Sequence, residues 1–358
     1  MYVLPSLAFT RPEFSAFFDV APAHEYGRDY NEKLGFFLVS VNDVGHDIKF
    51  VRSAAAPQHV SMTVSKKRAS FGITLRQSWA APIELPHDNL DEFTRKRVRN
   101  DHPLLALWEL GIWQLRLPLS DLADATTRVR MQAMRSRGHS FIVFSVGMPG
   151  IRERDVVIEH HKMIDRWEVI DPAHQIADTI RVMSEIGRVA PVQMALSKLE
   201  GMAEQRQNEE FEFSHFPVYG FRLQQRYNVL AQLREFDTTE LLDGLVFRLD
   251  KSRKPWESIR TAAEFAVESG MTTILHMALP RATEGRVFDD DAHIAEFVAQ
   301  TYVAALGEKN LQVILDTFVD HDRGYYPRHG LLDRRYNPRP AFHILRRLNE
   351  FFARGSAS

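Results

Sequence analysis

The side chains best suited to chemistry are three carboxylates and a histidine associated with apolar runs of the sequence. Asp316, His276 and Asp171 each lie in or at the end of such a run, and Asp320 follows Asp316 by four residues. Carboxylate and imidazole groups commonly transfer protons in enzymes. We therefore predict that Asp171, His276, Asp316 and Asp320 are catalytic residues.

Basic, aromatic and further acidic residues occur in comparable places, at the ends of apolar runs or in the segments that follow them. This mixture suits a polyhydroxylated or anionic small molecule, because binding pockets combine apolar walls with a few placed polar groups. The predicted substrate-binding residues are Arg76, Trp79, Arg116, Lys198, Tyr219, Asp250, Lys251, Asp322, Arg323 and Tyr325.

Several of these residues also have a structural interpretation. Arg116 could brace the fold through ion pairs with Asp171 or Asp316, and His276 could be a hydrogen-bonded core histidine. Asp171 precedes a proline and could cap the following helix. Asp320 could belong to an ion-pair network within its own loop.

The elements that must position these residues alternate between strand and helix over most of the chain. Such alternation produces a parallel sheet with helices outside it. We predict a (β/α)8 TIM barrel over residues 69–354, with active-site residues at the C-terminal ends of its strands. The predicted strands are 70–76, 112–117, 140–146, 166–171, 191–196, 244–250, 272–278 and 311–316.

Residues 1–68 do not follow the alternation. Short strand-like runs at 36–41, 48–51 and 60–64 are separated by turn-forming residues. We predict that 1–68 is a small β-rich segment packed on the barrel.

Composition excludes several classes of function. The 358-residue chain has a formal net charge of -2, whereas nucleic-acid binders usually carry a basic surface. It contains no cysteine, which excludes disulfides and thiolate metal sites and fits a cytoplasmic location. No stretch is apolar enough to span a membrane.

The sequence also predicts no metal and no cofactor. His276, Asp316 and Asp320 could form a metal site, but no His-x-His or His-Glu-x-x-His spacing supports one. No glycine-rich phosphate loop follows a strand, and no Gly-x-Ser-x-Gly nucleophile motif is present.

The end of the chain resembles the barrels of clan A glycoside hydrolases. The resemblance rests on Asp316, Asp320, Gly330-Leu-Leu-Asp333 and Asn337-Pro-Arg-Pro-Ala341, together with Arg116 on the second strand. It implies a (β/α)8 barrel that acts on carbohydrate.

The catalytic glutamates of that clan are not matched. Where the clan has Asn-Glu-Pro after strand 4, this chain has Asp171-Pro172, and strand 7 carries His276 in place of a glutamate. Retaining hydrolysis needs two carboxyl groups about 5–5.5 Å apart. A standard retaining β-glycosidase is therefore not expected.

Three hypotheses for function follow. The first is a hydrolase acting on a sugar, sugar acid or sugar lactone, with Asp171 or His276 as general base. In it, Arg116 and Lys251 hold the ligand, and Asp316 and Asp320 orient groups or supply acid.

The second hypothesis is a catalytically inactive relative that binds a sugar or a partner protein. The third is an aldolase- or isomerase-type barrel that forms a Schiff base on Lys198 or Lys251. A small-molecule carbohydrate or sugar acid is the expected partner, and a homo-oligomer is compatible with the sequence.

Overall fold

The structure is a computed structural model. It describes residues 37–41, 48–52, 70–75, 79–80, 82–84, 97–99, 101–171, 176–201, 218–235, 242–249, 254–279, 290–322 and 327–354.

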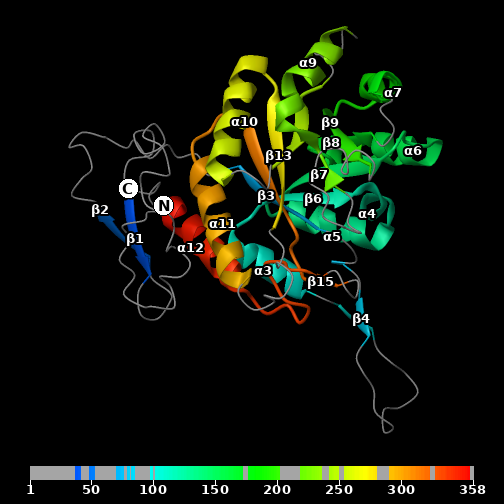
Figure 1. The fold of residues 1–358 in the computed structure, drawn as a ribbon. Coiled ribbons are helices and arrows are strands. Elements are labelled where there is room, and N and C mark those ends of the chain that lie inside the picture. Colours follow the sequence, from blue (N-terminus) through cyan, green and yellow to red (C-terminus); the bar gives the residue numbers. More distant parts are fainter. Residues whose placement is uncertain are drawn as a thin grey trace.

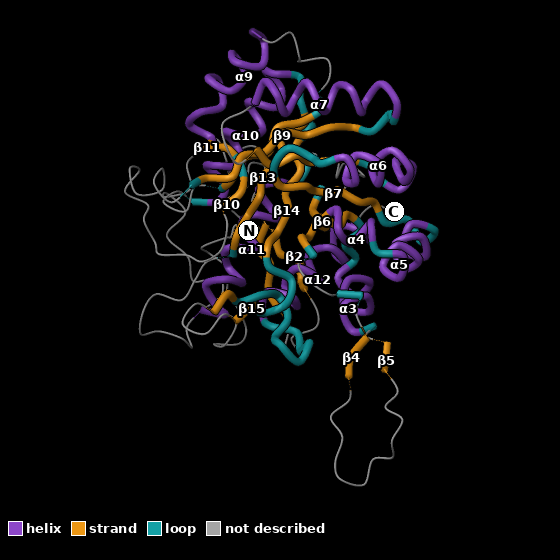
Figure 2. The backbone as a smooth tube through the Cα atoms, turned by 90° about the vertical axis from the view of Figure 1, so that its right-hand side faces the viewer, coloured by secondary structure: helices purple, strands orange, loops and turns teal. Residues whose placement is uncertain are grey.

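A closed ring of eight parallel strands forms the centre of the molecule, with helices around it (Figures 1 and 2). Its strands, in ring order, are β3 (Phe71–Thr74), β6 (Gln114–Pro118), β7 (Ser140–Val146), β8 (Arg166–Asp171), β9 (Gln193–Glu200), β12 (Gly244–Arg248), β13 (Thr272–Ala278) and β14 (Leu311–Asp316). The ring closes where β14 pairs with β3. The predicted (β/α)8 barrel is confirmed.

The helices occupy the connections between these strands. They are α3 (His102–Leu110), α4 (Leu119–Ala123), α5 (Ala125–Arg135), α6 (Ile151–His160), α7 (Ile176–Val189), α9 (Arg226–Glu235), α10 (Pro255–Ser269), α11 (Asp290–Ala305) and α12 (Pro340–Arg354), with the 3₁₀ turns η2 (His161–Met163) and η3 (Leu223–Gln225). Within the described residues, no helix is long and apolar enough to cross a bilayer.

Two predicted helices differ in the structure. The helix expected over 122–137 is divided into α4 and α5, because Asp124 is extended and its side chain caps α5 by accepting a hydrogen bond from the Thr127 N–H at 2.7 Å. In the segment 223–242, where the sequence predicts one helix, the described residues form η3 and α9 up to Glu235.

Side chains inside the barrel form layers. An apolar cluster of Ile142, Ala195, Val246, Ile274 and Ile314 fills the middle of the interior. Because alternate strand residues face the same side, the inward residues on either side of this cluster can be read from each strand.

Polar groups lie both above and below the apolar cluster. In β13 the inward series is Thr272, Ile274, His276 and Ala278, and in β14 it ends with Ile314 and Asp316. The polar layer at the C-terminal ends of the strands is called the mouth, and the layer at their N-terminal ends the floor. The larger apolar core lies on the other face of the strands, against the helices.

A short wedge of chain enters the ring between β9 and β12 near the mouth. The two strands pair directly at Ala195 with Gly244 and at Leu196 with Leu245. Farther along, β10 (Val218–Tyr219) pairs antiparallel with β9, and β11 (Phe221–Arg222) pairs parallel with β12. This wedge, residues 218–222, was not predicted from the sequence.

Three additional strand pairs lie outside the ring. They are β1 (Phe37–Val41) with β2 (Ile48–Arg52), β4 (Pro82–Glu84) with β5 (Arg97–Arg99), and β15 (His321–Asp322) with β16 (Pro327–Arg328). The first pair matches two of the three strands predicted in residues 1–68. The third, at 60–64, lies outside the described residues, and the packing of 1–68 on the barrel stays a prediction.

Candidate active site

His276 and Asp316 come together at the mouth. They lie on the inward faces of two adjacent strands, β13 and β14, near the C-terminal ends of these strands, and His276 Nε2 lies 3.7 Å from Asp316 Oδ2. Both residues are buried, and the Thr317 hydroxyl donates to Asp316 Oδ1 at 3.2 Å. The separation is too long for a direct hydrogen bond but short enough for the carboxylate to stabilise a protonated imidazole.

Arg116 and Glu168 form a buried ion pair in the same layer. Arg116 Nε and Nη2 donate to the two Glu168 carboxylate oxygens at 2.6 and 2.9 Å. The side chains are 1% and 0% exposed, so the pair is fully removed from water. Arg116 therefore does brace the barrel through an ion pair, as one interpretation of the sequence predicted. Its partner is Glu168, so the expected partners, Asp171 and Asp316, were wrong.

Tyr219 from the wedge joins the two pairs. Its ring lies 5.9 Å from the His276 ring in an edge-on arrangement, and the Arg116 guanidinium lies 5.5 Å from its centroid. The guanidinium also lies 4.1 Å from the centroid of the Phe144 ring. Among the described residues, the buried Arg116 Nη1 has no hydrogen-bond acceptor. The N–H groups of Arg116 Nη1 could therefore donate to a ligand oxygen.

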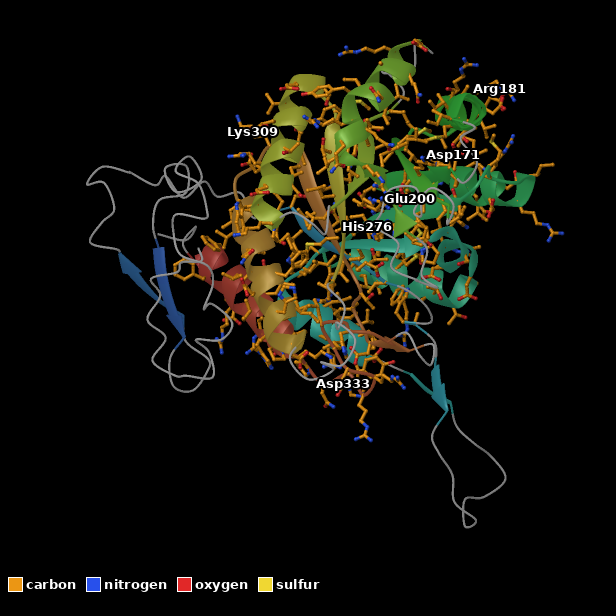
Figure 3. The ribbon with its side chains drawn as sticks, viewed as in Figure 1. Asp171, Arg181, Glu200, His276, Lys309 and Asp333 are labelled. Atoms are coloured by element: carbon orange, nitrogen blue, oxygen red, sulfur yellow. The ribbon has the colours of Figure 1, made fainter. Side chains whose placement is uncertain are left out.

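A second carboxylate is held by two arginines where the wedge meets the barrel. Arg222 Nε and Nη2 contact Glu200 Oε1 at 2.8 and 2.7 Å, and Arg248 Nη1 donates to Glu200 Oε2. These contacts fix the ends of β9, β11 and β12 relative to one another. Figure 3 shows Glu200 and His276 in the central part of the molecule.

Asp171 and Lys198 are neighbours on the other face of their strands. They are register partners in β8 and β9, and both are buried. Strand alternation places Asp171 on the same side as Trp167 and Val169, which pack against the helices, and opposite Glu168. In Figure 3, Asp171 lies apart from His276. The structure therefore groups His276 with Asp316 and does not add Asp171 to them.

Asp320 lies in an ion-pair network of the tail. Arg339 Nε donates to Asp320 Oδ1 at 3.0 Å and Arg339 Nη2 donates to Asp320 Oδ2, while the Gly330 N–H donates to Oδ1 at 2.7 Å. Burial raises the pKa of Asp320, but hydrogen bonds from His329, Arg339 and the Gly330 amide outweigh it and leave the pKa below its usual value. This geometry matches the loop ion-pair interpretation of Asp320.

Trp79 contacts a carboxyl group that sequence reasoning missed. Its indole Nε1–H donates to Asp121 Oδ2 at 2.7 Å, which links the segment after β3 to α4. Burial raises the pKa of Asp121 to about 6, with a smaller increase from Asp124 and an opposing effect from the Trp79 hydrogen bond. Asp121 therefore titrates nearer neutrality than an ordinary aspartate.

Most of the other predicted substrate-binding residues lie outside the part of the chain that the structure describes. Arg76, Asp250, Lys251, Arg323 and Tyr325 lie outside the described residues, and Asp322 is described only in its backbone, as part of β15. Within the described part of the chain, no group of three His, Asp or Glu residues could hold a metal ion.

Glu168 could have been found from the sequence. It lies two residues after Arg166 in a run whose alternate members, Trp167 and Val169, are apolar. That pattern places Glu168 inside the barrel, where it requires a cation. The signal for Asp121 was weaker, because the residue follows strand 2 within a short helix.

Comparison with solved structures found similarities at low sequence identity. An intracellular xylanase from Thermoanaerobacterium saccharolyticum is 10% identical over 79% of this chain and 96% of its own, with a TM-score of 0.48. A GH5 family lichenase from a Caldicellulosiruptor species is 10% identical over 86% and 98%, with a TM-score of 0.42. The (β/α)8 barrel itself is shown by the strand order of the ring.

The likeness is confined to the fold. A protein described as a putative mandelate racemase/muconate lactonizing enzyme from Sorangium cellulosum is 13% identical over 68% of this chain and 52% of its own, with a TM-score of 0.35. Such barrels serve different chemistries. No protein-family model matches the chain, and no curated protein matches it.

Proposed function

We propose that this protein is a hydrolase that opens a sugar lactone, or a closely related ester of a sugar acid, at the mouth of the barrel. The observation that carries the proposal is the position of His276 and Asp316 beside Tyr219. An imidazole next to a carboxylate is a water-activating arrangement. The cysteine-free composition fits activity in the cytoplasm.

In the proposed mechanism, a water molecule binds between His276 Nε2 and Asp316 Oδ2. Atoms 3.7 Å apart can both reach one water at hydrogen-bond distance. His276 removes a proton as the water oxygen bonds to the lactone carbonyl carbon. The ring carbon–oxygen bond then breaks, and the departing oxygen takes the proton back from His276. Asp316 orients the water and stabilises the imidazolium.

Arg116 and Tyr219 would bind the substrate. The remaining N–H of Arg116 can donate to the carbonyl oxygen as negative charge develops on it. The ring of Tyr219, which lies beside His276 and Arg116, provides an apolar surface for a sugar ring. Hydrolysis through a glutamate pair receives no support, because both oxygens of Glu168 are engaged by Arg116.

The test is a pH-stat assay of acid release from a panel of aldonolactones. His276→Gln should lower kcat by about a hundredfold or more, which is the usual contribution of a general base. His293→Gln, on the exposed surface of α11, is the matched control and should retain wild-type activity. Full turnover by His276→Gln would remove the proposed base.

Asp316→Asn separates orientation from proton transfer. The amide can still bind water but cannot stabilise the imidazolium, so we expect a smaller loss, about tenfold in kcat, and a change in the pH dependence of the rate. An unchanged pH profile with the same loss would make Asp316 only structural.

The second candidate is a sugar-binding protein without turnover. The engagement of Glu168 by Arg116 favours it, because the buried carboxylate is held as an ion pair rather than offered to a substrate. Saturable binding of an aldonolactone, reduced in a Tyr219→Ala variant, with no acid release at any pH would select this function.

The Schiff-base alternative has less support. Lys198 is the register partner of Asp171 and lies on the face of β9 opposite the interior series that includes Ala195 and Ser197. Lys251 lies outside the described residues. Borohydride trapping with a carbonyl compound remains its direct test.

A further inference from the structure

A cavity lies at the floor, the opposite end of the barrel from His276 and Asp316. It has a volume of about 430 Å³, which is in the range of small-molecule pockets. The beginnings of β9 and β13, residues just before β12, and the C-terminal ends of α9 and α10 form its wall. Its polar lining residues are Gln193, Arg234, Asp243, Ser269 and Thr272.

Arg166 inside the barrel fixes two of the lining side chains. Its Nη2 donates to Gln193 Oε1 at 3.1 Å and to the Thr272 hydroxyl oxygen at 3.4 Å. Since these oxygens already accept hydrogen bonds, the Gln193 amide N–H₂ and the Thr272 O–H are left as donors.

Asp243 and the helix ends supply acceptors. Asp243 Oδ2 accepts a hydrogen bond from the Met194 N–H at 2.6 Å, and Oδ1 has no partner among the described residues. The last turns of α9 and α10 end at the cavity, and helix C-termini present carbonyl oxygens with partial negative charge. The Arg234 guanidinium from α9 adds donors at the rim.

The charges of this wall nearly balance. Arg166 and Arg234 are positive, whereas Asp243 and the two helix ends are negative. A wall of this kind does not select a strongly charged ligand. It offers both donors and acceptors at short range, which is what vicinal hydroxyl groups require.

We infer that the floor cavity is a binding site for a neutral polyhydroxylated molecule of monosaccharide size, separate from the mouth. Gln193, Arg234 and Thr272 donate to ligand oxygens, and Asp243 accepts from ligand hydroxyls. Arg166 is a positioning residue, because it acts through Gln193 and Thr272.

The experiment is hydrogen exchange by mass spectrometry on the full chain, with D-glucose, D-xylose and myo-inositol as probes up to 100 mM. At least one probe should slow exchange in 230–235, 242–245 and 269–273. The same protection should persist in Tyr219→Ala, which alters only the mouth. Protection confined to mouth segments, or none with any probe, would overturn the inference.

Paired variants test the assigned contacts. Arg234→Gln should weaken binding about threefold and Thr272→Val about fivefold, because each removes one ligand hydrogen bond. Arg181→Gln, on the exposed face of α7 and remote from the cavity, is the charge-matched control and should bind normally. Wild-type affinity in both cavity variants would contradict the assignment, as would binding of inorganic phosphate in preference to all three probes.

Discussion

Arg116 and Arg166 are two buried arginines inside one barrel, and they are stabilised in different ways. At the mouth, Arg116 is 1% exposed and makes a two-bond contact with the Glu168 carboxylate. At the floor, Arg166 is 6% exposed, and among the described residues it donates only to the neutral groups of Gln312, Gln193 and Thr272. Burial lowers the pKa of Arg166, with partial compensation from Asp243, Glu168 and Asp165 at longer range.

The two arginines differ in how their charge is stabilised. The Glu168 carboxylate neutralises Arg116, whereas neutral hydrogen-bond acceptors solvate Arg166. Removing one member of a buried ion pair leaves the other charge uncompensated, which is strongly unfavourable. Removing a cation that is held by neutral groups leaves only polar atoms without partners. The mouth should therefore be the more sensitive end to loss of its arginine.

The largest effect is expected for Arg116→Met. The substitution keeps side-chain volume but leaves the Glu168 carboxylate buried without a cation, so we expect a loss of about 4 kcal/mol in the free energy of unfolding. Urea denaturation monitored by circular dichroism measures it. The double variant Arg116→Met/Glu168→Leu should recover most of the loss; failure to recover would show that packing on Phe144 and Tyr219 dominates.

A smaller loss is expected for Arg166→Met. Three neutral partners lose a donor, while the cost of burying a cation disappears, which gives a net loss of about 2 kcal/mol. The same urea titration provides the measurement. A loss equal to or greater than that of Arg116→Met would break the comparison between the two ends.

Asp320 and Arg339 extend the comparison to a partly exposed pair. The pKa of Asp320 is lowered in the fold, so its contribution is present above the unfolded pKa of about 4 and is lost as pH falls through the lowered value. Asp320→Asn should cost about 1 kcal/mol at pH 7. The stability of the Asp320→Asn variant should also vary less below pH 4 than that of the wild type. Parallel pH profiles of the two proteins would show that Asp320 is not the titrating group.

The smallest effect concerns Asp121, a carboxyl without a cation. Burial raises its pKa to about 6, so its contribution to stability is present below about pH 4 and is lost as pH rises through about 6. Trp79 donates to this carboxyl. Tryptophan fluorescence should show an inflection near pH 6 that is missing in Asp121→Asn, and an unchanged titration would exclude this assignment.

Much of the fold could be predicted because strand and helix alternate with clear breaks. Gly111 ends α3 in the left-handed conformation at φ 70°, and Pro255 begins α10, as their positions in the sequence indicate. The break at Asp124 was missed, although an aspartate before Ala-Thr-Thr is a good helix cap. Local sequence signals therefore predicted whether a segment is a helix or a strand better than they predicted where it begins and ends.

The site was predicted in part, for reasons that follow from geometry. His276 and Asp316 could be brought together from the sequence because they end adjacent strands. The wedge could not be predicted from the sequence, since its strands contain two residues each and carry no periodic signal. The contact between Trp79 and Asp121 joins the segment after β3 to helix α4, which follows β6, and no sequence spacing specifies it.

Gly220 lets the wedge approach the barrel closely. It has a φ of 96°, and a Cβ atom there would lie 2.8 Å from the Arg248 nitrogen and the Phe247 carbonyl carbon. A larger residue would therefore push Tyr219 outward while leaving the β14–β3 closure and the layers of the cylinder intact. During evolution, a single substitution at Gly220 can therefore change the position of the Tyr219 ring at the mouth without a matching change in the barrel.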